Sequence, residues 1–427
     1  MVGPDLSDLA EQARAALRSL AGVATPEREY YVPGRIEFLG KHTDYAGGRS
    51  LLGAVERGIR LAAAPRADRR VRIADARSGE RVELEIDSAL TPHPGHWSDY
   101  PITVARRIAR NFSRAPSLRG ADLAFASDLP PAAGMSSSSA LVVAVFTALA
   151  DVNALERRPE YRADIRSPED LAGYLGAVES GLSFGALAGD TGVGTFGGSE
   201  DHIAILCSRP GILRQYAFCP VRHERDASLP AGWRLVIAVS GVAAEKTGSA
   251  REQYNRASQA VATMLAAWQA ATGRSDGSLA AALASTPDAP ERMRQIIAES
   301  LRPRLEQVLA ESTEIIPAAT AALAKGDVAA LGPLVDRSQA LAARCLGNQI
   351  PETIALARRA RELGAAAASA FGAGFGGSVW ALVRAQDTPA FRARWAEAYR
   401  REFPDAARRA EFFDTGAGPG LLRVNAA

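Results

Sequence analysis

The stretch "GRIEFLGKHTDYAGG", residues 34–48, joins an apolar run to a polar, glycine-rich turn. The run "IEFL" predicts a short strand, because apolar residues here are bounded by glycines. The residues that follow are too polar for a core and too rich in glycine for a helix. Arg35, Lys41, His42 and Asp44 are therefore crowded around the end of one strand, which makes this turn the first candidate for a functional site.

The composition is that of an ordinary globular protein. With 427 residues, 47% of them hydrophobic and 23% charged, the chain is long enough for two domains or three. The net charge of +2 gives no reason to expect a nucleic acid as partner. Three widely spaced cysteines without a CxxC pair favour a reducing, cytoplasmic environment. The N-terminus is unlike a signal peptide, and no apolar run approaches the roughly 18 residues of a membrane span, so no membrane partner is expected.

The periodicity of apolar residues predicts an α+β protein in two halves. Helices are expected over 6–20, 102–112, from 137 onward, and over 250–272, 290–300, 302–324 and 351–364, with Pro317 breaking or kinking the helix that contains it. Strands are expected over 30–39, 58–64, 70–74, 81–86, ahead of residue 128, and over 202–207, 233–240 and 377–383. A boundary near residues 210–230 divides the chain into domains 1–220 and 221–427.

The second informative stretch is "DLPPAAGMSSSSALVVAVFTAL", residues 128–149. It reads as a Pro-Pro loop in which one glycine and four serines open a long apolar helix. Backbone N–H groups at the start of a helix have no internal partner and lie at the positive end of its dipole. Together with serine hydroxyls they predict a cradle for phosphates. The alternative is a serine-rich helix cap with no ligand.

The third stretch, "FGAGFGGSVWALV" at residues 371–383, formally contains GxGxxG. A dinucleotide-binding fold needs strand, glycines and helix in that order. Here the expected order is helix, glycines and strand, which argues against that fold. Glycines in this position allow close approach to a ligand, or simply form a tight turn. The chain contains no P-loop, no HExxH and no zinc-type Cys/His spacing.

The three stretches together resemble the motifs of the GHMP small-molecule kinases, and among these the galactokinases most. "PGRIEFLGKHTDYAGG" is similar to PGRxxxxGEHTDYxGG, "LPPAAGMSSSSAL" to LPxGxGLSSSAAL, and "GAGFGGSVWALV" to GxGFGGxxxALV. The resemblance covers essentially the whole length. It implies a two-domain kinase with its active site in the cleft between domains, which uses ATP and Mg²⁺ to phosphorylate the C1 hydroxyl of a galactose-type sugar.

The resemblance also assigns residues to roles. Arg35 is expected to steady the base and the transferring phosphoryl group. Sugar contacts are expected from Lys41, His42, Asp44, Tyr45 and Tyr254. ATP contacts are expected from Gly134, Met135, Ser136, Ser137, Ser138, Ser139, Gly374 and Gly376. Ser138 and Glu179 are the expected magnesium ligands, since Mg²⁺ prefers hard oxygen donors.

The catalytic base is harder to place, because the galactokinase segment GIMDQ is absent. Counting forward from Glu179 and back from the strand expected at 202–207 both lead to Thr191, one residue beyond Asp190. Allowing one deletion makes Asp190 the expected base. Asp201 is the alternative, and a third possibility is that no carboxylate acts as base, since phosphoryl transfer depends mainly on positioning and charge neutralisation.

A departure within the first motif is Lys41, which stands where the family has glutamate. That glutamate accepts a hydrogen bond from the 6-hydroxyl of the sugar, whereas an ammonium can only donate. One hypothesis is therefore a sugar with an altered C6, such as galacturonate; the alternative is that Lys41 points to solvent or to a phosphate. A non-catalytic sugar and ATP sensor on the same fold is a further reading, and "HTDY" argues against mevalonate or homoserine as substrate. The expected assembly is a monomer or weak homodimer.

Overall fold

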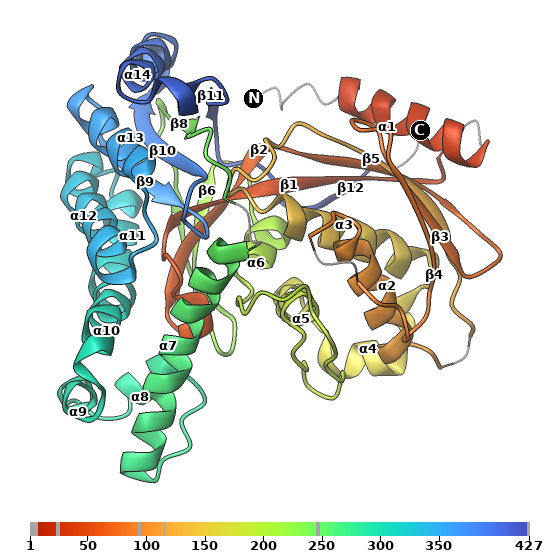
Figure 1. Cartoon of the computed structure of the whole chain (residues 1–427), viewed down its shortest axis with the longest axis horizontal. Helices are drawn as coiled ribbons and strands as arrows, with labels where there is room; N and C mark the ends of the chain where they lie inside the picture. Colours follow the sequence, from red (N-terminus) through yellow and green to blue (C-terminus); the bar gives the residue numbers. More distant parts are fainter. Residues whose placement is uncertain (1–6, 23–25, 93–94, 115, 245–247, 425–427) are drawn as a thin grey trace.

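The computed structural model describes residues 7–22, 26–92, 95–114, 116–244 and 248–424. They form two mostly antiparallel sheets that lie side by side and are covered by helices (Figure 1). The mixed helix and sheet architecture agrees with the predicted α+β class. In the described part of the chain, no helix has the length and apolar character needed to cross a membrane.

The first sheet has the strand order β12-β1-β2-β5-β3-β4, with β6 also paired to β2 and β7 to β6. Its strands are β1 (Arg28–Leu39), β2 (Arg49–Pro65), β3 (Arg70–Asp75), β4 (Arg81–Glu85), β5 (Ala121–Ser127), β6 (Ile212–Ala217), β7 (Arg222–Ser228) and β12 (Leu422–Val424). The second sheet, in the order β11-β8-β10-β9, consists of β8 (Trp233–Val239), β9 (Ala367–Phe371), β10 (Ser378–Arg384) and β11 (Glu411–Thr415).

Fifteen α-helices lie within the described residues. They are α1 (Ser7–Ala21), α2 (Asp99–Asn111), α3 (Ser137–Val152), α4 (Pro159–Asp164), α5 (Pro168–Ser180), α6 (Glu200–Cys207), α7 (Gly248–Thr272), α8 (Leu279–Leu283), α9 (Ala289–Ile296), α10 (Arg302–Leu309), α11 (Ile316–Ala324), α12 (Val328–Leu341), α13 (Pro351–Glu362), α14 (Thr388–Glu402) and α15 (Pro404–Ala407). Shorter helical turns include a 3-10 turn at Asp44–Ala46 and π-helical turns at Ala310–Ile315 and Ala342–Leu346.

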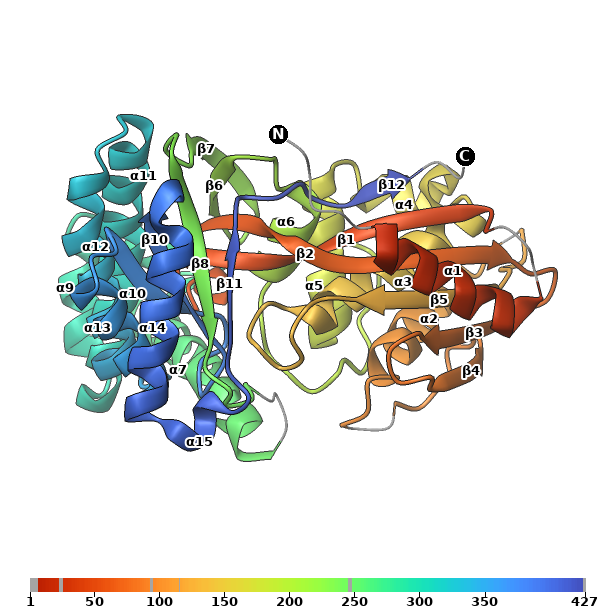
Figure 2. The same cartoon turned by 90° about the horizontal axis from the view of Figure 1, so that it is seen from above.

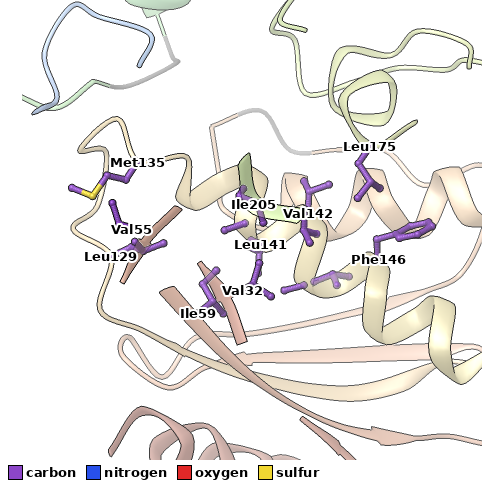
Figure 3. Packing of buried hydrophobic residues seen from close by; sticks show 14 of the residues in the cluster. Val32, Val55, Ile59, Leu129, Met135, Leu141, Val142, Phe146, Leu175 and Ile205 are labelled. Atoms are coloured by element: carbon purple, nitrogen blue, oxygen red, sulfur yellow. The ribbon is translucent and has the colours of Figure 1, made fainter. Parts of the chain in front are cut away.

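The first sheet lies between two helical layers. Helix α1 packs on small residues of β2 and β5, and its Ala13 and Leu17 are fully buried there. The opposite face packs on α3 and α6, whose Leu141 and Ile205 belong to the same core (Figure 3). Helix α5 packs on these two helices, with its Tyr174 against Phe146 of α3. Helix α3 is apolar on nearly every side because it lies inside this core, as a continuous apolar run predicts.

The core continues from the first sheet into the second. Phe38 of β1 stacks on Trp380 of β10, with ring centroids 4.1 Å apart. On its other face the second sheet buries Leu356 of α13 and Trp395 of α14. The chain after β11 crosses back, so that β12 pairs with β1 on the first sheet (Figure 2). The chain passes from the first sheet to the second between β7 and β8, and β12 returns to the first. The division into domains near residues 210–230 stays a prediction.

One predicted strand is wrong. Residues 202–207 belong to α6, not to a strand. A short apolar run suits either a buried strand or a buried helix, and periodicity alone does not separate them. Here β2 already pairs with β1, β5 and β6, so the run packs across the sheet as a helix instead.

Two further expectations need correction. The helix predicted over 302–324 consists of α10, the π-helical turn Ala310–Ile315 and α11, with Pro317 in the first turn of α11. Proline is tolerated there, so the chain remains helical through it. The glycines after Phe371 follow strand β9, not a helix, and lead into the antiparallel strand β10. A dinucleotide-binding fold is still excluded, because no helix follows those glycines.

Candidate active site

The turn after β1 is held tightly by its own residues. The hydroxyl of Thr43 bonds to the carbonyl oxygens of Gly40 and Arg49, at 2.8 and 2.6 Å. His42 adopts a left-handed backbone conformation with φ of 57°, and its ring lies between Tyr45 and the third motif. Nε2 of His42 lies 3.0 Å from the carbonyl oxygen of Ala373, and Nδ1 lies 2.8 Å from the hydroxyl of Tyr45. Because a carbonyl only accepts, Nε2 is the donor in the first of these contacts.

This turn forms one wall of a polar pocket, called the first pocket here. It is lined by Arg35, His42, Asp44, Tyr45, Ser139, Glu179, Thr195, Glu200, Asp201, His202, Tyr254, Gly372 and Ala373, with Gly176, Ser180, Gly197 and Gly198. The structure therefore brings four of the five predicted sugar-contacting residues together with Arg35. The ring of Tyr254, from α7, lies 5.0 Å from that of His42.

A larger, second pocket adjoins the first. Its walls include the predicted phosphate loop, through Gly134 and Ser136–Ser138, and the aromatic residues Trp97, Tyr100 and Phe125. Arg35 and Ala373 line both pockets. The two pockets therefore meet at Arg35 and Ala373.

Arg35 joins the first and second motifs. Its backbone N–H donates to the carbonyl of Met135 at 3.1 Å, and its Nη1 donates to the carbonyl of Gly134. Its Nε donates to Oδ1 of Asp201 at 2.5 Å, and its side chain is only 4% exposed. Burial lowers the pKa of Arg35, but the charges of Asp201 and Glu200 more than offset burial, so the pKa lies above its ordinary value. Arg35 is a fixed cation at this point.

The structure places the two candidate bases differently. Asp201, in the first turn of α6, pairs with Arg35 and lines the first pocket. Asp190 forms a two-point ion pair with Arg106 of α2, at 2.6 and 2.7 Å, and is absent from the linings of both pockets. Burial raises the pKa of Asp190, yet Arg106 holds it below its ordinary value. The geometry therefore brings Asp201, not Asp190, to Arg35.

Lys41 is the predicted sugar contact that does not reach the first pocket. Its side chain is fully buried, and Nζ donates to the hydroxyls of Ser369 on β9 and Ser338 on α12, at 2.8 and 3.4 Å. The alternative drawn from the sequence, that Lys41 points to solvent or to a phosphate, is therefore wrong as well, because the side chain is buried against β9 and α12.

The serine loop opens α3 through Ser136, which has a left-handed φ of 56°. Ser138 lines the second pocket. Its neighbour Ser139 is fully buried, lines the first pocket and donates to Oε2 of Glu179 at 2.8 Å. The same oxygen of Glu179 lies 3.3 Å from Nε2 of His202. Glu179 therefore contacts Ser139 and His202 directly. The magnesium site that it is expected to share with Ser138 stays a prediction.

The third motif forms a turn beneath the phosphate loop. The hydroxyl of Ser378 donates to the carbonyl of Ala133 at 2.6 Å. Gly372 has φ of 83°, and a Cβ there would lie 2.8 Å from the carbonyl oxygen of Gly134. The turn residues that reach the pockets are Gly372 and Ala373. The predicted Gly374 and Gly376 pack on other backbone segments and do not line either pocket.

Two carboxyl groups line the first pocket together, those of the buried Asp44 and the partly buried Glu200. The backbone N–H of Glu200 donates to Oδ2 of Asp44 at 3.2 Å, and Glu200 itself accepts from Ser50. Burial raises the pKa of both carboxyl groups above their ordinary values, and for Glu200 the nearby charge of Asp44 adds to the effect. The pocket is therefore rich in hydrogen-bond acceptors suited to hydroxyl groups.

Sequence reasoning missed Glu200, Gly372 and Ala373 and preferred Asp190 to Asp201. A usable signal existed in "GSEDH", residues 198–202, because its glycine and aspartate have the same spacing as those of GIMDQ. The counts led to Asp190 because they assumed that the loop between Glu179 and residue 202 has the family's length.

Comparison with protein families gives matches in all three motif regions. The galactokinase galactose-binding signature matches residues 18–65, the N-terminal domain of the GHMP kinases residues 99–185, and the C-terminal GHMP kinase domain residues 319–401. These ranges contain the first-motif turn, the phosphate loop and the third motif.

Among solved structures, a galactokinase from Lactococcus lactis complexed with galactose superposes with a TM-score of 0.79 at 23% identity, covering 98% of this chain and all of that one. A mevalonate kinase from Methanococcus jannaschii superposes with a TM-score of 0.56 at 12% identity, covering 91% of this chain and 98% of that one. At these identities the superpositions show the fold alone, which is the two-domain GHMP kinase fold predicted from the sequence.

Curated relatives extend the likeness along the chain. A galactokinase from Chloroflexus aggregans is 29% identical over 385 residues, covering 88% of each chain. A galactokinase from Roseiflexus sp. (strain RS-1) is 30% identical over 400 residues, covering 92% of each. The chain belongs to the galactokinase family of the GHMP kinases, which are ATP-dependent kinases of small molecules.

Proposed function

We propose that this sugar kinase transfers the γ-phosphoryl group of ATP to the C1 hydroxyl of galactose. The observation that carries the proposal is that Arg35 and Ala373 line both pockets. A sugar in the first pocket and a triphosphate in the second would meet at the Arg35 guanidinium. A cation fixed at that point stabilises the negative charge of a transferring phosphoryl group without having to reorganise.

Asp201 is the base in this proposal, in place of Asp190. Its carboxylate takes the proton of the C1 hydroxyl while the C1 oxygen forms a bond to the γ-phosphorus. The bond between that phosphorus and the oxygen of the β-phosphate breaks, and the products are the sugar 1-phosphate and ADP. The ion pair with Arg35 supports an ionised, oriented carboxylate at position 201.

Sugar recognition is assigned to His42, Asp44, Tyr45 and Tyr254, with Glu200 as an additional acceptor. Carboxylates accept hydrogen bonds from vicinal hydroxyls, and an aromatic ring offers an apolar face to the sugar. The burial of Lys41 removes the reason for proposing galacturonate, since its ammonium is not in the pocket.

Magnesium is the proposed metal, held by Glu179 and the hydroxyl of Ser138. The donors fit: Glu179 is a buried carboxylate beside the serine loop, and hard oxygen atoms are the ligands that Mg²⁺ prefers. When bound, the ion neutralises charge on the β- and γ-phosphates. Ser139 keeps the carboxylate of Glu179 oriented through its hydrogen bond.

The test is ADP release with galactose, galacturonate, mevalonate and no acceptor, together with calorimetric binding of each sugar. Turnover with galactose and formation of a product phosphorylated at C1 are expected. Binding of galactose without turnover would show a sensor and overturn the proposal. A cytoplasmic location, and a monomer or weak homodimer, remain predictions from the sequence.

A further inference from the structure

The first-motif turn carries a buried lysine that neither pocket uses. Lys41 is fully buried, and its Nζ donates to Ser369 on β9 and Ser338 on α12. These partners lie 328 and 297 residues later in the chain, and β9 belongs to the second sheet. The side chain therefore ties the turn at the end of β1 to the opposite half of the molecule.

Two buried carboxyl groups interact electrostatically with this ammonium. Glu37 of β1 and Glu311 of the π-helical turn are both fully buried. Ser338 donates its hydroxyl hydrogen to Oε1 of Glu311 and so bridges that carboxylate to Lys41. Within the described part of the chain, Oε1 of Glu37 and Oε2 of Glu311 have no hydrogen-bond partner. Buried carboxylates in this condition are costly unless a nearby cation compensates them.

Glu37 connects this cluster to the active site. Its Oε2 accepts a hydrogen bond from the backbone N–H of Gly372 at 3.2 Å. The next residue, Ala373, lines both pockets and accepts from His42 through its carbonyl. The charge of Lys41 acts on Glu37 electrostatically, lowering its pKa, and Glu37 in turn holds the third motif. The third motif contacts His42, the residue next to Lys41.

Backbone contacts anchor the same turn from a second side. Nε2 of Gln307, on α10, donates to the carbonyl of Lys41 at 3.0 Å, and Arg304 donates to the carbonyl of His42. The position of the turn therefore depends on elements of the second half.

We infer that Lys41 is a positioning residue. Its ammonium compensates Glu37 and Glu311 and thereby holds the first-motif turn and the Gly372–Ala373 turn in place around the two pockets. A glutamate at position 41 would be a third buried carboxylate in this cluster. The inference concerns the enzyme of the proposed function, but it makes a claim about charge compensation that can be tested without turnover.

The test compares Lys41→Met with the double variant Lys41→Met/Glu311→Gln, and uses the exposed Lys325→Met as control. In Lys41→Met, kcat/KM for galactose is expected to fall by about ten- to a hundredfold, because displaced turns misplace the reacting groups. Adding Glu311→Gln removes one uncompensated carboxylate. The logarithm of kcat/KM is therefore expected to recover by at least a third of the decrease that Lys41→Met causes. The ratio of activity on galactose to activity on galacturonate stays unchanged in all variants.

A double variant no better than Lys41→Met overturns the inference, and so does a change in the sugar ratio, which would indicate direct contact with substrate. If the native protein phosphorylates no sugar, thermal unfolding tests the role of Lys41 instead. Lys41→Met is then expected to lower Tm by about 5 °C and Glu311→Gln to restore part of it. If neither Lys41 variant folds while Glu311→Gln alone does, charge compensation is not the role of Lys41.

Discussion

At the scale of single residues, the contact that organises the site is the ion pair between Arg35 and Asp201. Arg35 is fixed by β1, by the carbonyls of the phosphate loop and by Asp201. Asp190 also accepts short hydrogen bonds, at 2.6 and 2.7 Å, but its partner is Arg106 on α2. Of the two carboxylates, only Asp201 pairs with the arginine that lines both pockets, and we therefore expect the two to have different roles.

Replacement of each aspartate by asparagine distinguishes them. Asp201→Asn is expected to lower kcat by about 10²- to 10⁴-fold, since the amide cannot take the proton of the sugar hydroxyl. Asp190→Asn, the matched control, is expected to change kcat by less than about tenfold while weakening the contact to Arg106. The measurement is steady-state ADP release at saturating ATP and sugar. Equal losses in the two variants, or a larger loss at 190, would contradict the assignment.

At the scale of elements, the site depends on three turns that pack on one another. The turn after β1, the loop before α3 and the turn between β9 and β10 meet around Arg35, where Gly372 approaches the carbonyl of Gly134. Each turn comes from a different part of the chain, and glycine is needed where the backbones approach closely.

Gly372→Ala tests this packing. Its Cβ would lie 2.8 Å from the carbonyl oxygen of Gly134 and 3.3 Å from the guanidinium of Arg35, at a φ of 83°. Gly364→Ala is a matched control, because Gly364 has φ of 99° but nothing within 4 Å of the added Cβ. Both variants are expected to lose on the order of 1 kcal/mol of stability from backbone strain. Only Gly372→Ala should also lower kcat/KM, by at least tenfold, as measured alongside chemical denaturation. Normal activity in Gly372→Ala would mean that the two turns need not touch.

At the scale of the whole molecule, the two halves are joined by a common interior. Phe38 stacks on Trp380, and the buried charges of Glu37, Lys41 and Glu311 lie near the same junction between β1 and the second half. Polar and apolar contacts therefore both fix how the halves sit around the site.

The buried Glu37 predicts a pH dependence of stability. Burial raises its pKa from an ordinary 4.5 to about 7, against the opposing charges of Lys41 and Arg35. Because the folded-state pKa is the higher one, the favourable contribution of the protonated form is complete below about pH 4.5 and is lost as the pH rises to 7. The loss has a slope of at most about 1.4 kcal/mol per pH unit.

Glu37→Gln removes this titration while its amide oxygen can still accept from Gly372. As the pH rises from 5 to 8, the free energy of unfolding of the native protein is therefore expected to fall relative to that of the variant. Urea denaturation at a series of pH values measures it. A difference that stays constant over this range would show that Glu37 is ionised throughout.

The sequence by itself determined the local elements and the kind of chemistry. The apolar run before the first turn, the serine-opened helix and the glycines before "SVWALV" predict β1, α3 and the turn before β10, because these signals lie within a few residues of the structure that they specify. The resemblance of the three motifs to those of the galactokinases gave the family in the same way.

Only the tertiary structure decided which side chains meet. Asp201 is 166 residues from Arg35 in the chain and reaches it because residues 200–207 form a helix packed on the first sheet, where the sequence suggested a strand. Lys41 turns away from the pocket toward Ser338 and Ser369, two distant serines that accept its hydrogen bonds, and toward the charge of the equally distant Glu311. Local sequence patterns cannot predict such partners, since the free energy of burying a charge depends on the groups that the whole fold places beside it.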